Sequence, residues 1–377
     1  MTTTTARPGS DPAPPNQPAP ASGRKVHTPL DEGKPLLQVS DLAVSFDNGS
    51  GPRIQAVDGV RMTIYPRQTL AVVGESGCGK SVSAMSLMHL IPRPPGRFDR
   101  GQAWFHTDRG PRDLLTYSES EIRSIRGNEI AMIFQEPMTS LNPVYTIGDQ
   151  IIEAILLHQN VSGNEAVDIA VEAMRSVGIK EPEKRLKAYP HQFSGGMRQR
   201  VMIAMALSCD PKLLIADEPT TALDVTIQAQ IIELAKKLRD QLGMAMIWIS
   251  HDLGVVAGLS DTVQVMYGGT IVERGPVTSV FKDTRHPYTL GLLKSLPRHD
   301  MRQGGEKLTQ IEGSPPDMRI PPKGCPFFAR CTYRIPGKCD VETPPLVPGE
   351  GGDPNHIKAC WVDVRTAVPV PLQEGVV

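Results

Sequence analysis

The stretch GESGCGKS, from Gly74 to Ser81, has the residue types and spacing that hold the phosphates of a nucleotide. It fits G-x-x-x-x-G-K-[ST] and lies between an apolar run, TLAVVG, and a helical pattern, KSVSAMSLMHLI, as a phosphate-binding loop requires. Its glycines let backbone N–H groups and the helix N-terminus point at the β-phosphate. Lys80 is expected to reach the β- and γ-phosphates, and the Ser81 hydroxyl to bind Mg²⁺. The predicted nucleotide-binding residues are Gly74, Glu75, Ser76, Gly77, Cys78, Gly79, Lys80 and Ser81.

Two further stretches supply carboxylates and a histidine for chemistry at this loop. The run LLIADEP places Asp217 and Glu218 at the end of a predicted strand, where α/β folds gather their ligands. Asp217 is expected to hold Mg²⁺, directly or through water, and Glu218 to polarise the attacking water. His251 follows the next predicted strand, MIWIS, and is expected on the γ-phosphate side. A histidine at a strand end is more often structural, so this assignment depends on the phosphate loop.

A second glycine-containing helix start follows later in the chain, in FSGGMRQRVMIAMALSC. Ser194, Gly195, Gly196 and Met197 stand at the start of a helical pattern, so they predict another exposed helix N-terminus that can bind an anion. One phosphate loop does not require such a second element.

The elements that position these residues are those of an α/β fold. Continuously apolar runs such as TLAVVG, KLLIADE and AMAMIWIS are typical of parallel strands covered on both faces. Between Asn142 and Phe193 helical patterns replace the strands, which predicts a helical insert. Residues 1–34 are rich in Thr, Pro and Ala and are expected to be disordered.

Composition excludes several classes of protein. The formal net charge is −1, with acidic and basic residues interspersed, so the chain lacks the basic surplus that nucleic-acid backbones require. No apolar run is long enough to cross a bilayer, and none near the N-terminus is typical of a signal peptide. We therefore expect a cytoplasmic chain with reduced cysteines.

Taken together, these motifs resemble the ATP-binding cassette (ABC) ATPases over about residues 36–275. SGGMRQ is similar to the family's signature motif, and Gln135 in IFQEP, Asp224 in TALD and His251 match its Q-loop, D-loop and switch histidine. Phe46 stands where an aromatic residue stacks on adenine. Longer matches, including HPYTLGLL and GCPFFARCTYR, resemble the D-type ATPase of bacterial dipeptide and oligopeptide importers, a group that also includes nickel and glutathione importers.

The resemblance implies a fold, a mechanism and a set of partners. The expected domains are an ABC cassette over 35–275, with a mixed sheet and a helical subdomain at about 140–196, and a loop-rich extension over 276–377. Glu218, His251 and Gln135 would be catalytic, with Mg²⁺ bound through Ser81, Gln135 and Asp217. Each signature motif closes the ATP site of a second ATPase, so we expect a heterodimer at the cytoplasmic face of the membrane, with two permeases and an extracytoplasmic binding protein.

Two other classes of function fit the sequence less well. A soluble ABC ATPase acting on nucleic acid is disfavoured by the lack of a tandem second cassette, of a long coiled-coil insert and of basic surplus. A non-hydrolysing subunit is disfavoured by the presence of Lys80, Glu218 and His251. Transport of nickel or another small solute stays open, since the binding protein and permeases select the substrate.

Four cysteines in the tail have the spacing C-x5-C-x7-C-x20-C, within Pro- and Gly-rich sequence over 323–362. A thiolate metal centre would supply the stability that this segment lacks. The spacing and the resemblance favour a [4Fe–4S] cluster, with zinc (His356 as a spare ligand) or reduced thiols as alternatives. The cluster ligands would be Cys325, Cys331, Cys339 and Cys360.

The other two cysteines differ from these. Cys209 is expected to be a small buried hydrophobe. Cys78 lies beside Lys80 and a helix N-terminus, which predicts a lowered pKa and a reactive thiolate.

Overall fold

The computed structural model describes residues 33–49, 51–107, 109–135, 140–221, 223–296 and 310–370. The disorder predicted for 1–34 therefore falls outside the described residues, apart from its last two positions. Among the described residues, no helix is long and apolar enough to cross a membrane.

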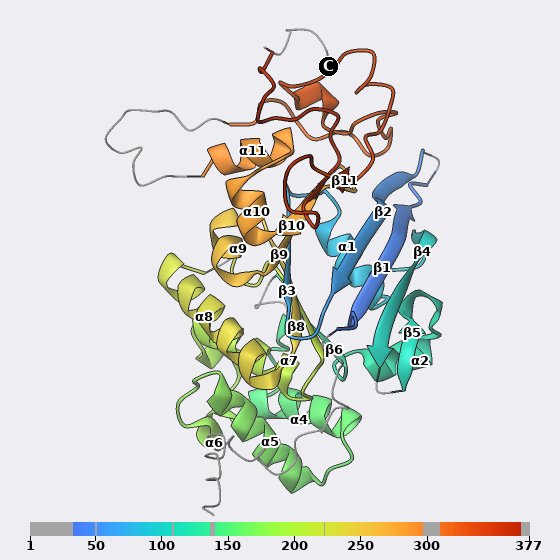
Figure 1. Cartoon of the computed structure of the whole chain (residues 1–377). Helices are drawn as coiled ribbons and strands as arrows, with labels where there is room; N and C mark the ends of the chain where they lie inside the picture. Colours follow the sequence, from blue (N-terminus) through green and yellow to red (C-terminus); the bar gives the residue numbers. More distant parts are fainter. Residues whose placement is uncertain are drawn as a thin grey trace, which may run out of the picture.

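A mixed sheet forms the centre of the molecule (Figure 1). Its order is β11-β12-β10-β9-β3-β8-β7-β6, and the strands from β9 to β6 are parallel, whereas β10, β11 and β12 pair antiparallel. Strands β3, β7 and β8 are buried along their whole length, which confirms that their apolar runs lie inside a covered parallel sheet. The strands are β3 (Thr69–Val73), β6 (Ile130–Ile133), β7 (Leu213–Asp217), β8 (Ala245–Ser250), β9 (Thr262–Tyr267), β10 (Thr270–Pro276), β11 (Val347–Pro348) and β12 (Ile357–Lys358).

A second, antiparallel sheet packs over helix α1 on one face of the central sheet. Its order is β2-β1-β4-β5, and its buried residues share one core with α1 and with alternate residues of β3, β7 and β8. Sequence periodicity did not single out this sheet. The strands of this sheet and the helices near them in the chain are β1 (Leu37–Phe46), β2 (Ile54–Ile64), α1 (Lys80–Leu87), β4 (Gly96–Thr107), β5 (Gly110–Asp113), η1 (Leu114–Thr116) and α2 (Glu119–Ile125).

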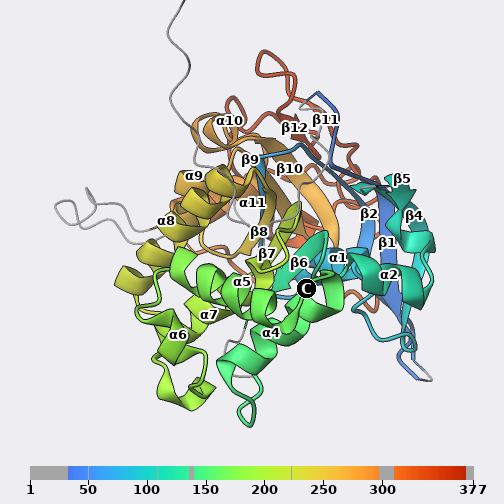
Figure 2. The same ribbon diagram turned by 90° about the horizontal axis from the view of Figure 1, so that it is seen from below.

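A helical layer covers the opposite face of the central sheet and extends away from it (Figure 2). Two of its helices begin at capping boxes: Thr146 with Asp149, and Ser162 with Glu165. Between 147 and 207 the described chain is helical or irregular, as the predicted helical insert requires. The elements are α4 (Ile147–His158), α5 (Gly163–Ser176), α6 (Pro182–Arg185), η2 (Pro190–Gln192), α7 (Gly195–Leu207) and α8 (Val225–Leu242).

The C-terminal region folds back onto the cassette instead of forming a separate unit (Figure 1). Strand β12 pairs with β10, so residues about 80 positions apart extend the central sheet. The expected boundary at residue 275 thus falls inside β10. The remaining helices are α9 (Leu253–Leu259), α10 (Val277–Lys282), α11 (Pro287–Lys294) and the short η3 (Phe328–Arg330).

A buried histidine anchors this region and makes its stability depend on pH. His286 is 1 % exposed, and its Nδ1 accepts the Tyr288 N–H at 3.1 Å as the N-cap of α11. Burial, together with the charge of nearby Lys358, lowers the pKa of His286 to about 3. The unfolded chain therefore binds one more proton than the folded chain between about pH 3 and pH 6.5, so stability is lost as pH falls below 6.5.

We expect the unfolding free energy to fall by about 1.4 kcal/mol between pH 7.5 and 5.5 from this group alone. His286→Asn, which can still accept the Tyr288 N–H but does not titrate, should lose correspondingly less. Chemical denaturation of both proteins at the two pH values measures the difference. Equal losses would show that His286 does not cause the pH dependence.

Candidate functional site

The predicted phosphate loop joins β3 to α1 in a conformation that requires glycine. Gly74 and Gly79 have φ values of +154° and +98°. A Cβ atom at Gly74 would lie 2.3 Å from the Met266 carbonyl oxygen, and one at Gly79 would lie 2.4 Å from the Ala56 carbonyl oxygen. Gly79 is also the N-cap of α1, so the loop leads directly into a helix N-terminus, where an anion is favoured.

Lys80 and Ser81 lie at the start of α1 and connect the loop to β7. Lys80 is 4 % exposed, and its Nζ donates to the carbonyl oxygens of Gly74 at 2.8 Å and Glu75 at 3.0 Å. Ser81 Oγ donates to Asp217 Oδ1 at 2.9 Å. Burial raises the pKa of Asp217, and the Ser81 hydrogen bond opposes that shift. This hydroxyl and carboxylate pair has the hard oxygen donors that Mg²⁺ prefers.

The next residue, Glu218, gathers three polar side chains around one carboxylate oxygen. Its Oε2 accepts from Gln135 Nε2 at 3.2 Å and from Thr221 Oγ1 at 3.0 Å, and lies 3.2 Å from His251 Nδ1. Glu218 has a left-handed backbone, with φ of +45°, which turns the chain at the end of β7. Three residues predicted from separate motifs thus meet at one point. Thr221 was missed, although its place three residues after Glu218 was a usable signal.

The signature residues lie on a different face of the sheet from the phosphate loop. Ser194 is the N-cap of α7, and its Oγ accepts the Met197 N–H at 3.3 Å. Helix α7 packs in the helical layer, whereas α1 packs against the antiparallel sheet on the other face. Ser194 and Gly195 are exposed. Asp224, the predicted D-loop residue, is the N-cap of α8, with Oδ1 accepting the Ile227 N–H at 3.0 Å.

Comparison with known proteins agrees with this arrangement. Residues 57–221 match the family model described as ABC transporter, and residues 272–339 match that of the oligopeptide/dipeptide transporter C-terminal region. The chain is 54% identical to the oligopeptide transport ATP-binding protein OppD of Bacillus subtilis, over 90% of this chain and 92% of that protein. It is 49% identical to the dipeptide transport ATP-binding protein DppD of the same organism, over 88% and 96%.

The chain belongs to the ATP-binding proteins of the oligopeptide/dipeptide ABC transporter family. Solved structures show the same fold. The post-hydrolysis dimer of the ATP-binding cassette MJ0796, bound to ADP and Pi, has a TM-score of 0.56 at 24% identity, covering 64% of this chain and 98% of that one. A cassette of Clostridium perfringens, cbiO1, has a TM-score of 0.55 at 25% identity, covering 66% and 91%. The predicted ABC cassette fold is therefore confirmed.

Phe46, the residue expected to stack on adenine, ends strand β1 and is half-buried. It packs against the core beneath the antiparallel sheet, near Gly96, where an added Cβ would lie 3.3 Å from its Cε1. Its contact with the base stays a prediction.

The prediction of a reactive Cys78 is wrong about the direction of its pKa. Cys78 is 5 % exposed, and burial raises the pKa of its thiol more than Lys80 lowers it. We expect iodoacetamide to modify Cys78 in the folded chain at least on the order of tenfold more slowly than in the denatured chain. Mass spectrometry of the labelled peptide over time measures both rates, and equal rates would contradict the buried, neutral thiol. Cys209 is buried, as predicted.

The four tail cysteines line one small cavity. Its other walls are mostly apolar or aromatic and include Phe327 and Trp361. Backbone N–H groups of Tyr333, Ile335 and Val362 donate to the sulfurs of Cys331, Cys339 and Cys360 at 3.3 to 3.4 Å.

The surroundings of Cys325 and Cys331 hold these two thiols neutral. Burial raises the pKa of Cys325 to about 11 and of Cys331 to about 12, and the neighbouring cysteines add to the shift. Within the described residues, no three His, Cys, Asp or Glu side chains are placed to hold a single metal ion. The expected spare ligand, His356, instead donates from Nε2 to Glu273 Oε1 at 2.7 Å, whereas His286 lines the cysteine cavity.

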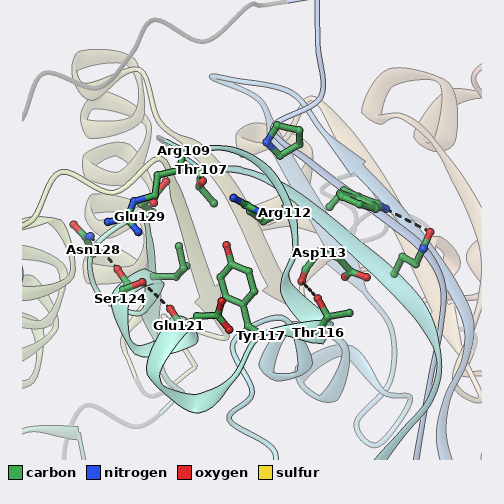
Figure 3. Close-up of a pocket in the computed structure, with 14 residues that line it drawn as sticks. Thr107, Arg109, Arg112, Asp113, Thr116, Tyr117, Glu121, Ser124, Asn128 and Glu129 are labelled. Atoms are coloured by element: carbon green, nitrogen blue, oxygen red, sulfur yellow. Dashed lines mark hydrogen bonds between the residues drawn. The ribbon is translucent and has the colours of Figure 1, made fainter.

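A separate cavity of about 710 Å³ lies between β4, β5, η1 and α2 (Figure 3). Arg112 and Tyr117 project toward its centre in Figure 3. Its acids already have partners: Asp113 caps η1, Glu121 caps α2, and Glu129 pairs with Lys212 at 3.1 Å. None of the sequence-predicted site residues lines this cavity.

Proposed function

We propose that this chain is the ATP-hydrolysing subunit of an importer for dipeptides or oligopeptides. The observation that carries the proposal is the Glu218 carboxylate, next to the Ser81–Asp217 pair and held by Gln135, Thr221 and His251. The peptide substrate is supported by the relatives, which are named as oligopeptide and dipeptide transport proteins.

In the proposed mechanism, the loop N–H groups and Lys80 bind the phosphates of ATP. Ser81 and Asp217, with Gln135, would hold Mg²⁺, which supplies charge neutralisation on the phosphates when bound. Glu218 accepts a proton from the attacking water, and its contacts with Thr221 and Gln135 fix the direction in which the carboxylate points. His251 Nδ1 lies 3.2 Å from the same Glu218 oxygen, which supports our proposal that His251 contacts the γ-phosphate.

The proposed site is completed by a second ATPase. The His251 side chain is 58% exposed and that of Glu218 is 14% exposed, so the site is open to solvent on the His251 side in a single chain. The exposed N-terminus of α7, on the other face of the sheet, is free to close a partner's site. We propose a related but distinct ATPase as partner, two permeases, an extracytoplasmic binding protein, and a position at the cytoplasmic face of the membrane.

Transport by the assembled complex tests this function. The chain is reconstituted with its partner ATPase and permeases in liposomes, with binding protein outside and ATP inside, and uptake of labelled dipeptides and longer peptides is measured. We expect ATP-dependent peptide uptake that Glu218→Gln abolishes. ATP-dependent uptake of nickel or another solute without peptide uptake would overturn the substrate. Purification of the chain with nucleic acid and without permeases would overturn the importer.

We also propose that Cys325, Cys331, Cys339 and Cys360 hold a [4Fe–4S] cluster. Four thiols facing one cavity, three of them receiving backbone N–H bonds, fit this group. In such a cluster each cysteine would hold a different iron, so the thiols would not need to converge as closely as around one zinc ion. Such a cluster would supply a covalent link between the loops of the tail.

Metal analysis of anaerobically purified protein tests the cluster. About four irons and four sulfides per chain, lost in Cys331→Ser but kept in Cys209→Ser, are expected. Stoichiometric zinc, or no metal in protein that is folded, would contradict it.

A further inference from the structure

The cysteine-containing tail contacts the phosphate loop directly through Glu75. Two nitrogens of Arg330 donate to the Glu75 carboxylate, Nη1 to Oε2 at 2.7 Å and Nη2 to Oε1 at 3.1 Å. The Glu75 backbone N–H donates to the Tyr288 hydroxyl at 2.9 Å. Lys80 donates to the Glu75 carbonyl oxygen from the other side. Both the side chain and the backbone of Glu75 are therefore held, one by a residue 255 positions away.

Arg330 is itself fixed by its surroundings. It is 7 % exposed, and its remaining hydrogen bonds go to the carbonyl oxygens of Ile311 and Glu312 and to the Tyr267 hydroxyl, at 2.9 to 3.3 Å. Its guanidinium also lies 5.8 Å from the centre of the Tyr267 ring. A planar guanidinium held by this many acceptors loses little further freedom in the two-point bond to Glu75.

The segment that carries Arg330 belongs to the cysteine region. Arg330 ends η3, which lies between Cys325 and Cys331, and the Phe328 N–H donates to the Cys325 carbonyl oxygen at 3.0 Å. Phe327, which precedes η3, lines the cysteine cavity and packs edge-on against the Tyr267 ring. One rigid aromatic cluster thus lies between the cysteines and the loop.

We propose that Arg330 is a positioning residue for nucleotide binding, which acts by holding and neutralising Glu75. This inference rests on the proposed ATP site. The bond keeps the Gly74–Ser76 backbone ordered before ATP arrives, so binding does not have to supply that ordering. It also balances a carboxylate located in the loop that receives the phosphates, where an uncompensated negative charge would repel ATP. Arg330 itself touches no reacting atom.

Equilibrium binding of MgATP to the full-length chain, measured by calorimetry, tests the proposal. We expect Arg330→Ala to weaken MgATP binding about tenfold and Arg330→Lys, which keeps the charge but not the two-point bond, to weaken it less. Arg319→Ala is the matched control, since Arg319 also makes a two-point bond to a carboxylate in the tail, that of Asp317. It should bind MgATP as the wild type does.

Two further measurements separate positioning from a general structural effect. If Arg330 acts through Glu75, Arg330→Ala should have a much smaller effect in a Glu75→Gln background. In the assembled transporter, Arg330→Ala should raise the KM for ATP while kcat at saturating ATP stays within about twofold, whereas partial unfolding would lower kcat instead.

The outcomes are distinct. A folded Arg330→Ala chain with unchanged affinity, or an equal effect of Arg330→Ala with and without Glu75, would overturn the inference while leaving the ATP site in place. If Arg330→Ala lowers the melting temperature, Glu75→Gln gives a second test, because it leaves every residue of the tail in place. Glu75→Gln alone is still expected to change the affinity for MgATP and to make that affinity independent of Arg330. A wild-type chain that does not bind MgATP would overturn the proposed function itself.

Discussion

Replacing Glu218 by glutamine is expected to lower ATP turnover of the assembled complex by about 10²- to 10⁴-fold, because the proposed general base for the attacking water is lost. Glutamine keeps the size and hydrogen-bonding oxygen of the side chain. The contacts to Gln135 and Thr221 can therefore persist, and the phosphate loop is untouched. MgATP affinity should accordingly stay within about twofold of the wild type, since binding and chemistry use different groups.

Steady-state phosphate release, together with MgATP binding to the same preparation, measures both effects. Glu233→Gln, an exposed glutamate on α8, is the matched control and should retain full turnover. Unchanged turnover in Glu218→Gln would show that another group accepts the proton. A parallel loss of MgATP binding would show that Glu218 contributes mainly to binding.

The second large effect is expected at the phosphate loop. Lys80→Ala should weaken MgATP binding on the order of 100-fold, because a buried ammonium that we propose contacts the β- and γ-phosphates is removed. In the structure Lys80 Nζ is bonded to the loop carbonyl oxygens of Gly74 and Glu75, so the charge already lies inside the loop before nucleotide binds. Little reorganisation is then needed on binding.

Calorimetric titration with MgATP checks this result, and thermal unfolding of the same sample checks that the loop change has not unfolded the chain. Lys237→Ala, at an exposed position on α8, should bind as the wild type does. A folded Lys80→Ala chain that binds MgATP with near-normal affinity would exclude the proposed role of Lys80.

The sequence alone determined the local structure of those parts of the site whose residues are close together in the chain. The loop glycines, Lys80 and Ser81 follow one another, so their order predicts both the turn and the helix start. Asp217 ends a fully buried strand and Glu218 follows it, and the apolar run that forms this strand also predicts the edge at which they lie. These predictions of local structure are confirmed, because the backbone geometry is set by residues that are neighbours in the chain.

Tertiary structure decided what depends on residues far apart in sequence. The antiparallel sheet pairs β1 with β4 across the intervening β3 and α1, which no local period reveals. The Cys78 prediction failed for a related reason: the charge of Lys80 is local and visible in sequence, but the burial that outweighs it comes from the fold. The bond between Glu75 and Arg330 spans 255 positions and places the tail on the ATP loop. Burial and long-range contacts arise only when the chain packs. They decide in which direction a pKa shifts, which side chains bond to each other, and how the tail is connected to the phosphate loop.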